Sequence, residues 1–183
     1  MRLLIVAGAV LIAAPGPARA EAYFTWAPGQ SREIEPGLRV TLERVMSGWR
    51  LWRYETADGS DCRAVRPAAG KLFPIPLDAD SFLRGAPALE IRFRQGEPAR
   101  WALHVADPGT RAFVRRSTGR WVEQAGWSAL DSLPSRELVV VEDWPEPDEV
   151  GQRIRGSERI VLGRMPKLLA AGKSCVARTV GRS

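Results

Sequence analysis

The chain has 183 residues, with 27 Lys and Arg against 21 Asp and Glu, two Cys and one His. This length suits one domain of ordinary size, and 45% hydrophobic with 26% charged residues is typical of a globular protein. The composition excludes a disordered chain and a multi-span membrane protein. Two Cys exclude a disulfide-dense scaffold, and with a single His we expect no metal and no cofactor.

The first twenty residues have the pattern of a secretory signal peptide. Arg2 supplies a positive start, residues 3–14 are an uncharged and mostly apolar run, and Ala18-Arg19-Ala20 is a small-x-small cleavage site. The alternative is a membrane anchor, but twelve helical residues span only about 18 Å of a hydrocarbon core of about 30 Å. We therefore expect cleavage after Ala20, which leaves residues 21–183 as a single β-rich domain without a transmembrane segment.

The mature chain is predicted to consist mainly of strands. Apolar and polar residues alternate most clearly at 89–94 and 101–105, with Gly96 in the turn between them, which predicts a hairpin with one buried face. A short helix is predicted to begin at Pro166 and to be stopped by Gly172. In chain order, the predicted strands cover residues 38–45, 49–55, 62–66, 89–94, 101–105, 113–115, 120–122, 137–141, 159–162 and 174–180.

Turn signals recur at short, regular intervals, as at Gly37, Gly59, Gly96 and Gly119. This spacing is typical of antiparallel sandwiches and barrels. We therefore predict an all-β, single-domain antiparallel sandwich or barrel with one short helix near the C-terminus.

Arg outnumbers Lys by 24 to 3, and together with the leader this bias suggests a bacterial periplasmic or secreted protein. That compartment is oxidising, so Cys62 and Cys175 are predicted to form a disulfide, the alternative being two free buried thiols. Such a bridge would close a loop of about 113 residues and, in the chain-entropy model, contribute about 4–5 kcal/mol.

The seven Trp residues are expected to divide between core and surface. Trp49 and Trp52 are three positions apart, so on one strand they face opposite sides, and Trp101 is in phase with the apolar residues of its strand. Most of the Trp residues are expected in the core. Trp144, in an acidic and Pro-rich segment, is the best candidate for an exposed contact.

Charge is unevenly distributed near the C-terminus. Residues 137–150 include six acidic and no basic residues, whereas residues 151–183 include eight basic residues and one acid, Glu158. We predict that this region contacts an envelope component or a partner protein, which could be anionic; the alternative is that the two segments pair with each other. Nucleic acid is not expected as a partner of an exported protein. The candidate contact residues are Glu142, Trp144, Glu146, Arg153, Arg155 and Arg159.

No catalytic residues are assigned. Asp78 with Asp80, and Asp58 with Asp61, are the carboxylate pairs to consider for glycoside hydrolysis, which needs two acids about 5–10 Å apart. His104 could act as a general base, but it lies opposite the apolar face of its strand, so we expect it to be exposed to water. The motifs of serine hydrolases, P-loops, dinucleotide sites, zinc sites and calcium loops are absent from the sequence.

Short motifs in the outer thirds of the mature chain form a recognisable layout. A Trp-containing strand at 49–54 is followed by Asp-Cys-Arg-Ala at 61–64, and the C-terminal part has Gly-Ser-Glu-Arg-Ile-Val-Leu at 156–162 and Lys-Ser-Cys at 173–175. This layout resembles the invasion-associated locus B family of small exported bacterial proteins. The resemblance implies a β-rich, disulfide-bonded envelope protein without established catalysis. This chain lacks the additional Cys that members often have near the first Trp strand.

These observations lead to one favoured function and two alternatives. The favoured function is that of an exported, non-catalytic protein, periplasmic or secreted, which binds an envelope component or a partner protein. The alternatives are a cell-wall hydrolase that uses carboxylates from separate strands, and a structural subunit of an envelope assembly. A cleft with two close, partly buried carboxylates would favour the hydrolase.

Overall fold

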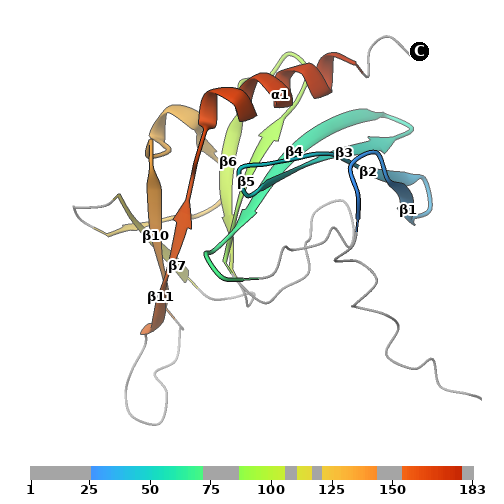
Figure 1. The fold of residues 1–183 in the computed structure, drawn as a ribbon. Helices are drawn as coiled ribbons and strands as arrows, with labels where there is room; N and C mark the ends of the chain where they lie inside the picture. Colours follow the sequence, from blue (N-terminus) through green and yellow to red (C-terminus); the bar gives the residue numbers. More distant parts are fainter. Residues whose placement is uncertain (1–25, 72–86, 106–110, 117–120, 144–153, 179–183) are drawn as a thin grey trace, which may run out of the picture.

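The computed structural model describes residues 26–71, 87–105, 111–116, 121–143 and 154–178. These residues form two antiparallel sheets and one helix (Figure 1). The seven-stranded sheet has the order β1-β2-β3-β4-β5-β6-β9, formed by Ser31–Glu35, Leu38–Met46, Trp49–Thr56, Gly59–Pro67, Ala88–Phe93, Arg100–His104 and Ser128–Ala129. The four-stranded sheet has the order β11-β10-β7-β8, formed by Ile154–Val161, Glu137–Asp143, Arg111–Arg116 and Val122–Glu123. A short 3-10 turn, Leu130–Ser132, follows β9, and the helix α1 is Met165–Ala177.

The predicted all-β class is confirmed, and the described strands form two separate sheets in a sandwich-like arrangement rather than a barrel. The alternation at 89–94 corresponds to β5, which pairs with β6 in the predicted hairpin. The short strands β1 and β9 were not predicted, and β11 begins at Ile154 instead of residue 159. Both differences concern strands with little or no apolar alternation, so the hydrophobic pattern carries no signal for them.

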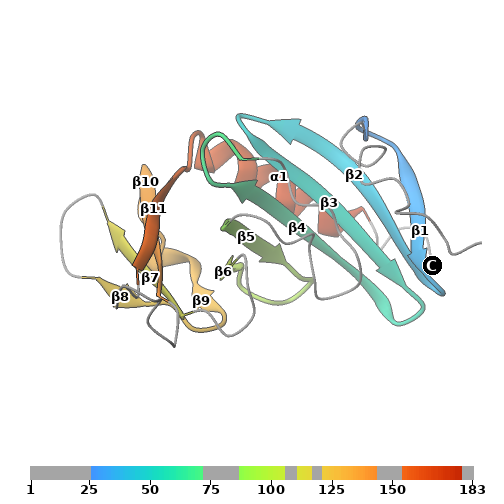
Figure 2. The same ribbon diagram turned by 90° about the horizontal axis from the view of Figure 1, so that it is seen from below.

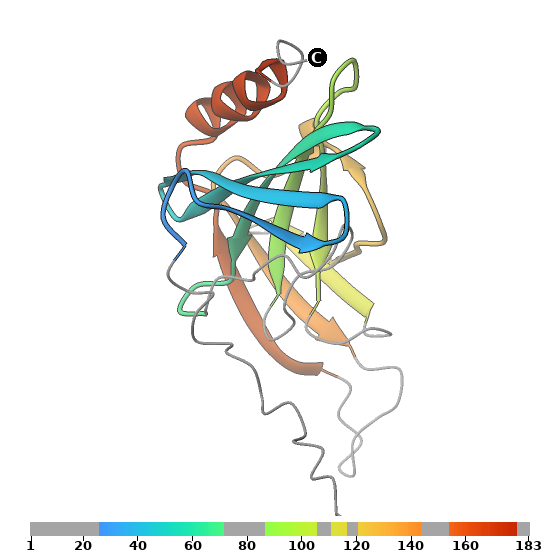
Figure 3. The same cartoon turned by 90° about the vertical axis from the view of Figure 1, so that its right-hand side faces the viewer.

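The central strands of the seven-stranded sheet have buried residues on both sides of the sheet, which we call the helix face and the far face. On the helix face, α1 and the four-stranded sheet together cover the strands, as the views from below and from the side show (Figures 2 and 3). The core of this face includes Leu51, Ile91, Leu138, Ile160 and Leu168. The far face has a second core, formed by Trp26, Leu38, Val40, Leu42, Trp52, Tyr54, Val65 and Ala88.

The Trp residues divide as their strand positions predict. Trp49 lies in the core of the helix face and Trp52 in the core of the far face, and Trp101 is buried with Trp49. Trp121 is 40% exposed, and Trp144 lies outside the described residues. No described helix has the length and apolar character needed to cross a membrane.

The helix α1 is longer than predicted and is attached to the sheet by the predicted disulfide. Cys175 of α1 bonds to Cys62 of β4, with 6.3 Å between the Cα atoms. The prediction that Gly172 ends the helix was wrong, as was the strand predicted at 174–180, because the helix continues to Ala177. Gly172 instead allows close packing: a Cβ atom there would lie 2.4 Å from Cε2 of Phe93.

Candidate functional site

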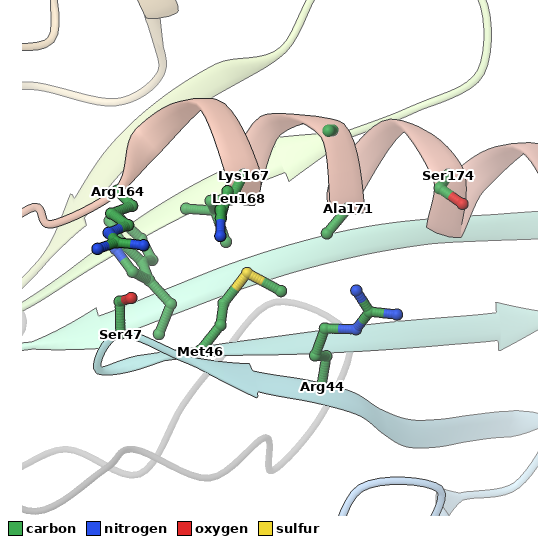
Figure 4. Close-up of a pocket in the computed structure, with 10 residues that line it drawn as sticks. Arg44, Met46, Ser47, Arg164, Lys167, Leu168, Ala171 and Ser174 are labelled. Carbon is green, nitrogen blue, oxygen red and sulfur yellow. The ribbon is translucent and has the colours of Figure 1, made fainter.

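A groove of about 460 Å³ lies between α1 and the β2–β3 hairpin (Figure 4). This volume is in the usual range for ligand pockets, roughly 300–1,000 Å³. The groove is lined by Arg44, Met46, Ser47, Trp49, Arg164, Lys167, Leu168, Ala170, Ala171 and Ser174.

A β-bulge in β2 directs two side chains into the groove. Before the bulge, Leu38, Val40 and Leu42 belong to the core of the far face. The pairing register with β3 shifts between Leu42 and Arg44, so the alternation changes phase at that point. As a result, Arg44 and Met46 face α1 and line the groove.

The turn between β2 and β3 forms one end of the groove, and contacts of Arg66 and Trp49 hold it in place. The Arg66 guanidinium donates a hydrogen bond to the carbonyl oxygen of Ser47. Gly48 has a φ of +80°, which favours glycine, and a Cβ atom there would lie 2.6 Å from Nη1 of Arg66, so that the guanidinium would have to shift. Trp49 Nε1 donates to the carbonyl oxygen of Leu162, just before α1, at 2.6 Å. These contacts connect the hairpin to the segment that leads into the helix.

The groove combines an apolar floor with a basic edge. Trp49 and Leu168 are fully buried beneath it, and Met46 is half-buried. Arg44, Arg164 and Lys167 are exposed, and within the described part of the chain their side chains have no ion pair or hydrogen bond. None of the described lining residues is acidic. The groove therefore has three cations that lack a partner among the described residues, and they surround an apolar surface.

Figure 4 shows how these groups are distributed along the groove. Arg164 lies at the end beside Ser47, Lys167 lies on α1 across from Met46, and Arg44 lies further along the groove, beyond Met46. Beyond Arg44, Glu43 bonds to Arg178 at the end of α1 through atoms 2.8 Å apart.

A second polar feature lies on the far face, where β4, β5 and β6 carry a buried charge network of Asp61, Arg63, Glu90, Arg92 and His104. The Glu90 side chain is fully buried and that of Arg63 is 5% exposed. Arg63 Nη2 lies 3.1 Å from Asp61 Oδ2, and Glu90 Oε1 lies 3.7 Å from Arg63 Nε and 3.6 Å from Arg92 Nε. His104 Nε2 contacts Glu90 Oε2. Both acids are thus held by arginines from neighbouring strands.

Two aromatic rings flank the charge network. The Arg63 guanidinium lies 4.1 Å from the ring centroid of Tyr54, and that of Arg92 lies 4.2 Å from the ring of Trp127. Burial raises the pKa of Tyr54 well above its usual value of 10.0. For Arg63, burial acts to lower the pKa, but Asp61 and Glu90 outweigh it and raise the pKa overall. Burial lowers the pKa of Arg92.

The position of His104 corrects one expectation. Its strand phase is as predicted, because Trp101 faces the helix side and His104 faces away from it. The prediction that it is open to water holds only in part, since its side chain is 28% exposed and contacts the buried Glu90. Of the charged positions in the alternating pattern of β5, Glu90 is buried and Arg92 is half-buried.

The hydrolase alternative requires two close carboxylates in a cleft, and the charge network contains two carboxylates, Asp61 and Glu90. Asp61 and Glu90 come from separate strands and both lie close to Arg63, but neither lines the groove. Asp58 is exposed, and Asp78 and Asp80 lie outside the described residues. Among the described residues, no group of three or more His, Cys, Asp or Glu side chains is arranged to hold a metal ion. Hydrolysis stays a prediction without a described cleft.

Half of the six contact residues predicted from sequence lie outside the described structure. Trp144, Glu146 and Arg153 lie outside it, and Glu142 and Arg155 are described only as backbone of β10 and β11. Arg159 is exposed and its Nε lies 3.7 Å from Glu137 Oε2. This contact region therefore stays a prediction.

The groove was not predicted from the sequence. Its only local signal is the i, i+3 spacing of Arg164 and Lys167, which places two cations together on a helix. Comparison with protein-family models, curated proteins and solved structures finds no match.

Proposed function

We propose that the protein is an exported, non-catalytic binding protein and that an anionic envelope component or partner binds in the groove between α1 and the β2–β3 hairpin. The observation that carries this proposal is the presence of three cations around one apolar groove, Arg44, Arg164 and Lys167, none of which has a partner in the described part of the chain. Unpaired charge of one sign in a concave site attracts and orients ligands of the opposite sign.

Two further observations support export and binding. The Cys62–Cys175 disulfide fits an oxidising compartment, as does the signal-peptide pattern of the first twenty residues. The resemblance to the invasion-associated locus B family points to the same compartment and stays a prediction. A structural role in an envelope assembly also stays a prediction; a monomeric elution volume at high concentration would count against it.

The test is capture of envelope components on immobilised mature protein, residues 21–183, at low and at moderate salt. We expect captured material that is lost as salt rises, because salt screens exposed charges. The variant Arg44→Ala/Arg164→Ala/Lys167→Ala should lose this material.

The matched control is Arg39→Ala/Arg136→Ala/Lys173→Ala. It removes the same number of exposed cations from positions that do not line the groove. Equal loss in both triple variants would mean that total charge, and not the groove, attracts the ligand. Capture that survives in the groove variant would contradict the proposed site.

A further inference from the structure

We propose that the occupant of the groove is an extended acidic peptide segment of a partner protein, in which an apolar side chain lies between two acidic side chains. This inference rests on the proposed function and specifies its ligand. It follows from the order of charged and apolar groups along the groove.

The cations are separated along the groove and not gathered at one point. Arg164 lies beside the hairpin turn with Lys167 next to it along α1, and Arg44 lies beyond Met46 (Figure 4). A ligand with one anionic head would satisfy only one of these positions. Two anionic groups with a spacer between them satisfy both, which favours two acidic side chains on one chain.

The middle of the groove requires an apolar group. Met46 is a flexible, polarisable side chain that adapts to apolar partners, and it lies over the buried Leu168 with Ala171 beside it. A sulfated glycan or a polyphosphate would leave this surface uncovered. Trp49 is only 1% exposed, so it offers no ring face on which a sugar or a base could stack.

The spacing of the lining residues matches a peptide in extended form. Arg44 and Met46 are two positions apart on the same face of β2, beyond the bulge. An extended ligand repeats its side chains every two residues with about the same rise, 6.5–7 Å. A ligand with an acid, an apolar residue and a second acid at positions i, i+2 and i+4 would therefore place these side chains against Arg44, Met46 and the Arg164–Lys167 pair, respectively.

The test is fluorescence anisotropy with a dye-labelled peptide, Gly-Glu-Ser-Leu-Ser-Glu-Gly, and the disulfide-bonded mature protein. We expect saturable binding that weakens as salt rises. Replacing both Glu by Gln should abolish it, and replacing Leu by Gly should weaken it about tenfold because the apolar contact is lost. Removing one cation, as in Arg44→Ala or Lys167→Ala, should weaken binding up to about fivefold.

Lys173→Ala is the matched control for Lys167→Ala, because it removes the same charge from the same helix at a position outside the groove. It should leave peptide binding unchanged. Equal binding of the Gln peptide, equal effects of the two Lys variants, or no binding of the acidic peptide would each overturn the inference.

One further probe separates this inference from the proposed function. Dodecyl phosphate has one anionic head on an apolar chain. If it binds, and the Arg44→Ala/Arg164→Ala/Lys167→Ala variant loses it while the peptide does not bind, the occupant is an amphiphile. The inference then fails and the groove remains the binding site. If the groove variant still captures envelope material in the salt experiment, the proposed function fails as well.

Discussion

At the scale of single residues, the buried charge network of the far face is the most demanding feature of the molecule. Arg63 and Arg92 each lie close to both Asp61 and Glu90, and each rests on an aromatic ring. Charges taken out of water need partners, and each of these four charges lies close to at least two groups of opposite charge. Loss of one member should therefore leave an uncompensated charge behind.

Glu90→Gln should lower the free energy of unfolding by about 3 kcal/mol, because it leaves the buried Arg63 and the half-buried Arg92 with one shared acid. Urea unfolding at neutral pH measures this change. The control is Glu97→Gln, which removes a 53% exposed carboxylate paired to Arg94 at 3.9 Å; it should cost less than about 0.5 kcal/mol. Equal effects of the two substitutions would show that the network does not depend on Glu90.

Tyr54→Phe should leave the free energy of unfolding at pH 7 unchanged or raise it by up to about 1 kcal/mol, because the buried Tyr54 hydroxyl has no hydrogen-bond partner in the described structure. Above its usual pKa of 10.0, an unfolded Tyr54 loses its proton while the folded side chain keeps it. Unfolding then releases a proton, so stability falls as pH rises from about 10. The variant should lose less stability than the wild type over that range in urea unfolding.

Gly172→Ala should destabilise the protein by about 1–3 kcal/mol, although Ala normally favours a helix over Gly. The added Cβ would lie 2.4 Å from Phe93, so α1 would have to move away from β5. Adding Phe93→Leu should recover part of the loss in the same unfolding experiment. A gain in stability from the single substitution would mean that helix and strand are less closely packed than described.

At the scale of elements, the disulfide connects the only described α-helix to the centre of the seven-stranded sheet. Cys62→Ala/Cys175→Ala should lower the free energy of unfolding by about 2–5 kcal/mol, since the bridge joins residues 113 apart and restrains the unfolded chain. Wild-type protein unfolded under reducing conditions should match the variant. A wild type that keeps its full stability when reduced would contradict the bridge.

Strand alternation predicted most elements because one side of each strand is apolar. It located β2, β3, β5 and β6 and assigned Trp49 and Trp52 to opposite faces. The same pattern did not predict that Glu90, on the polar side of β5, is buried. Alternation distinguishes the two faces of a strand without showing whether the polar face is covered. Gly172 was misleading for a related reason, since a helix-ending glycine and a glycine under a packed ring look alike in sequence.

At the scale of the whole molecule, the groove could not be predicted because it depends on three separate structural features. The bulge in β2 turns Arg44 and Met46 towards the helix, the hairpin turn is held on Arg66, and the disulfide sets α1 beside them. None of these is visible in a local hydrophobic pattern. The unequal charge of residues 137–183 is visible, but it indicates an anionic partner without indicating where it binds.

Export is also a property of the whole chain. We expect the mature protein to begin at Glu21, with 25 basic and 21 acidic residues, and mass spectrometry of protein from the envelope fraction measures its N-terminus. Its two Cys should react with an alkylating reagent only after reduction. An uncut chain found with free thiols in the cytoplasm would contradict both the location and the binding of an envelope partner.

The attachment of α1 at several points has a consequence for how the groove selects its ligand. Cys175 ties the helix to β4, and at its end Arg178 bonds to Glu43, which also bonds to Arg53 within the sheet. The distance between the two walls is therefore set before a ligand arrives. A ligand of the right width binds without the cost of ordering the protein backbone, whereas a wider one is rejected and not accommodated.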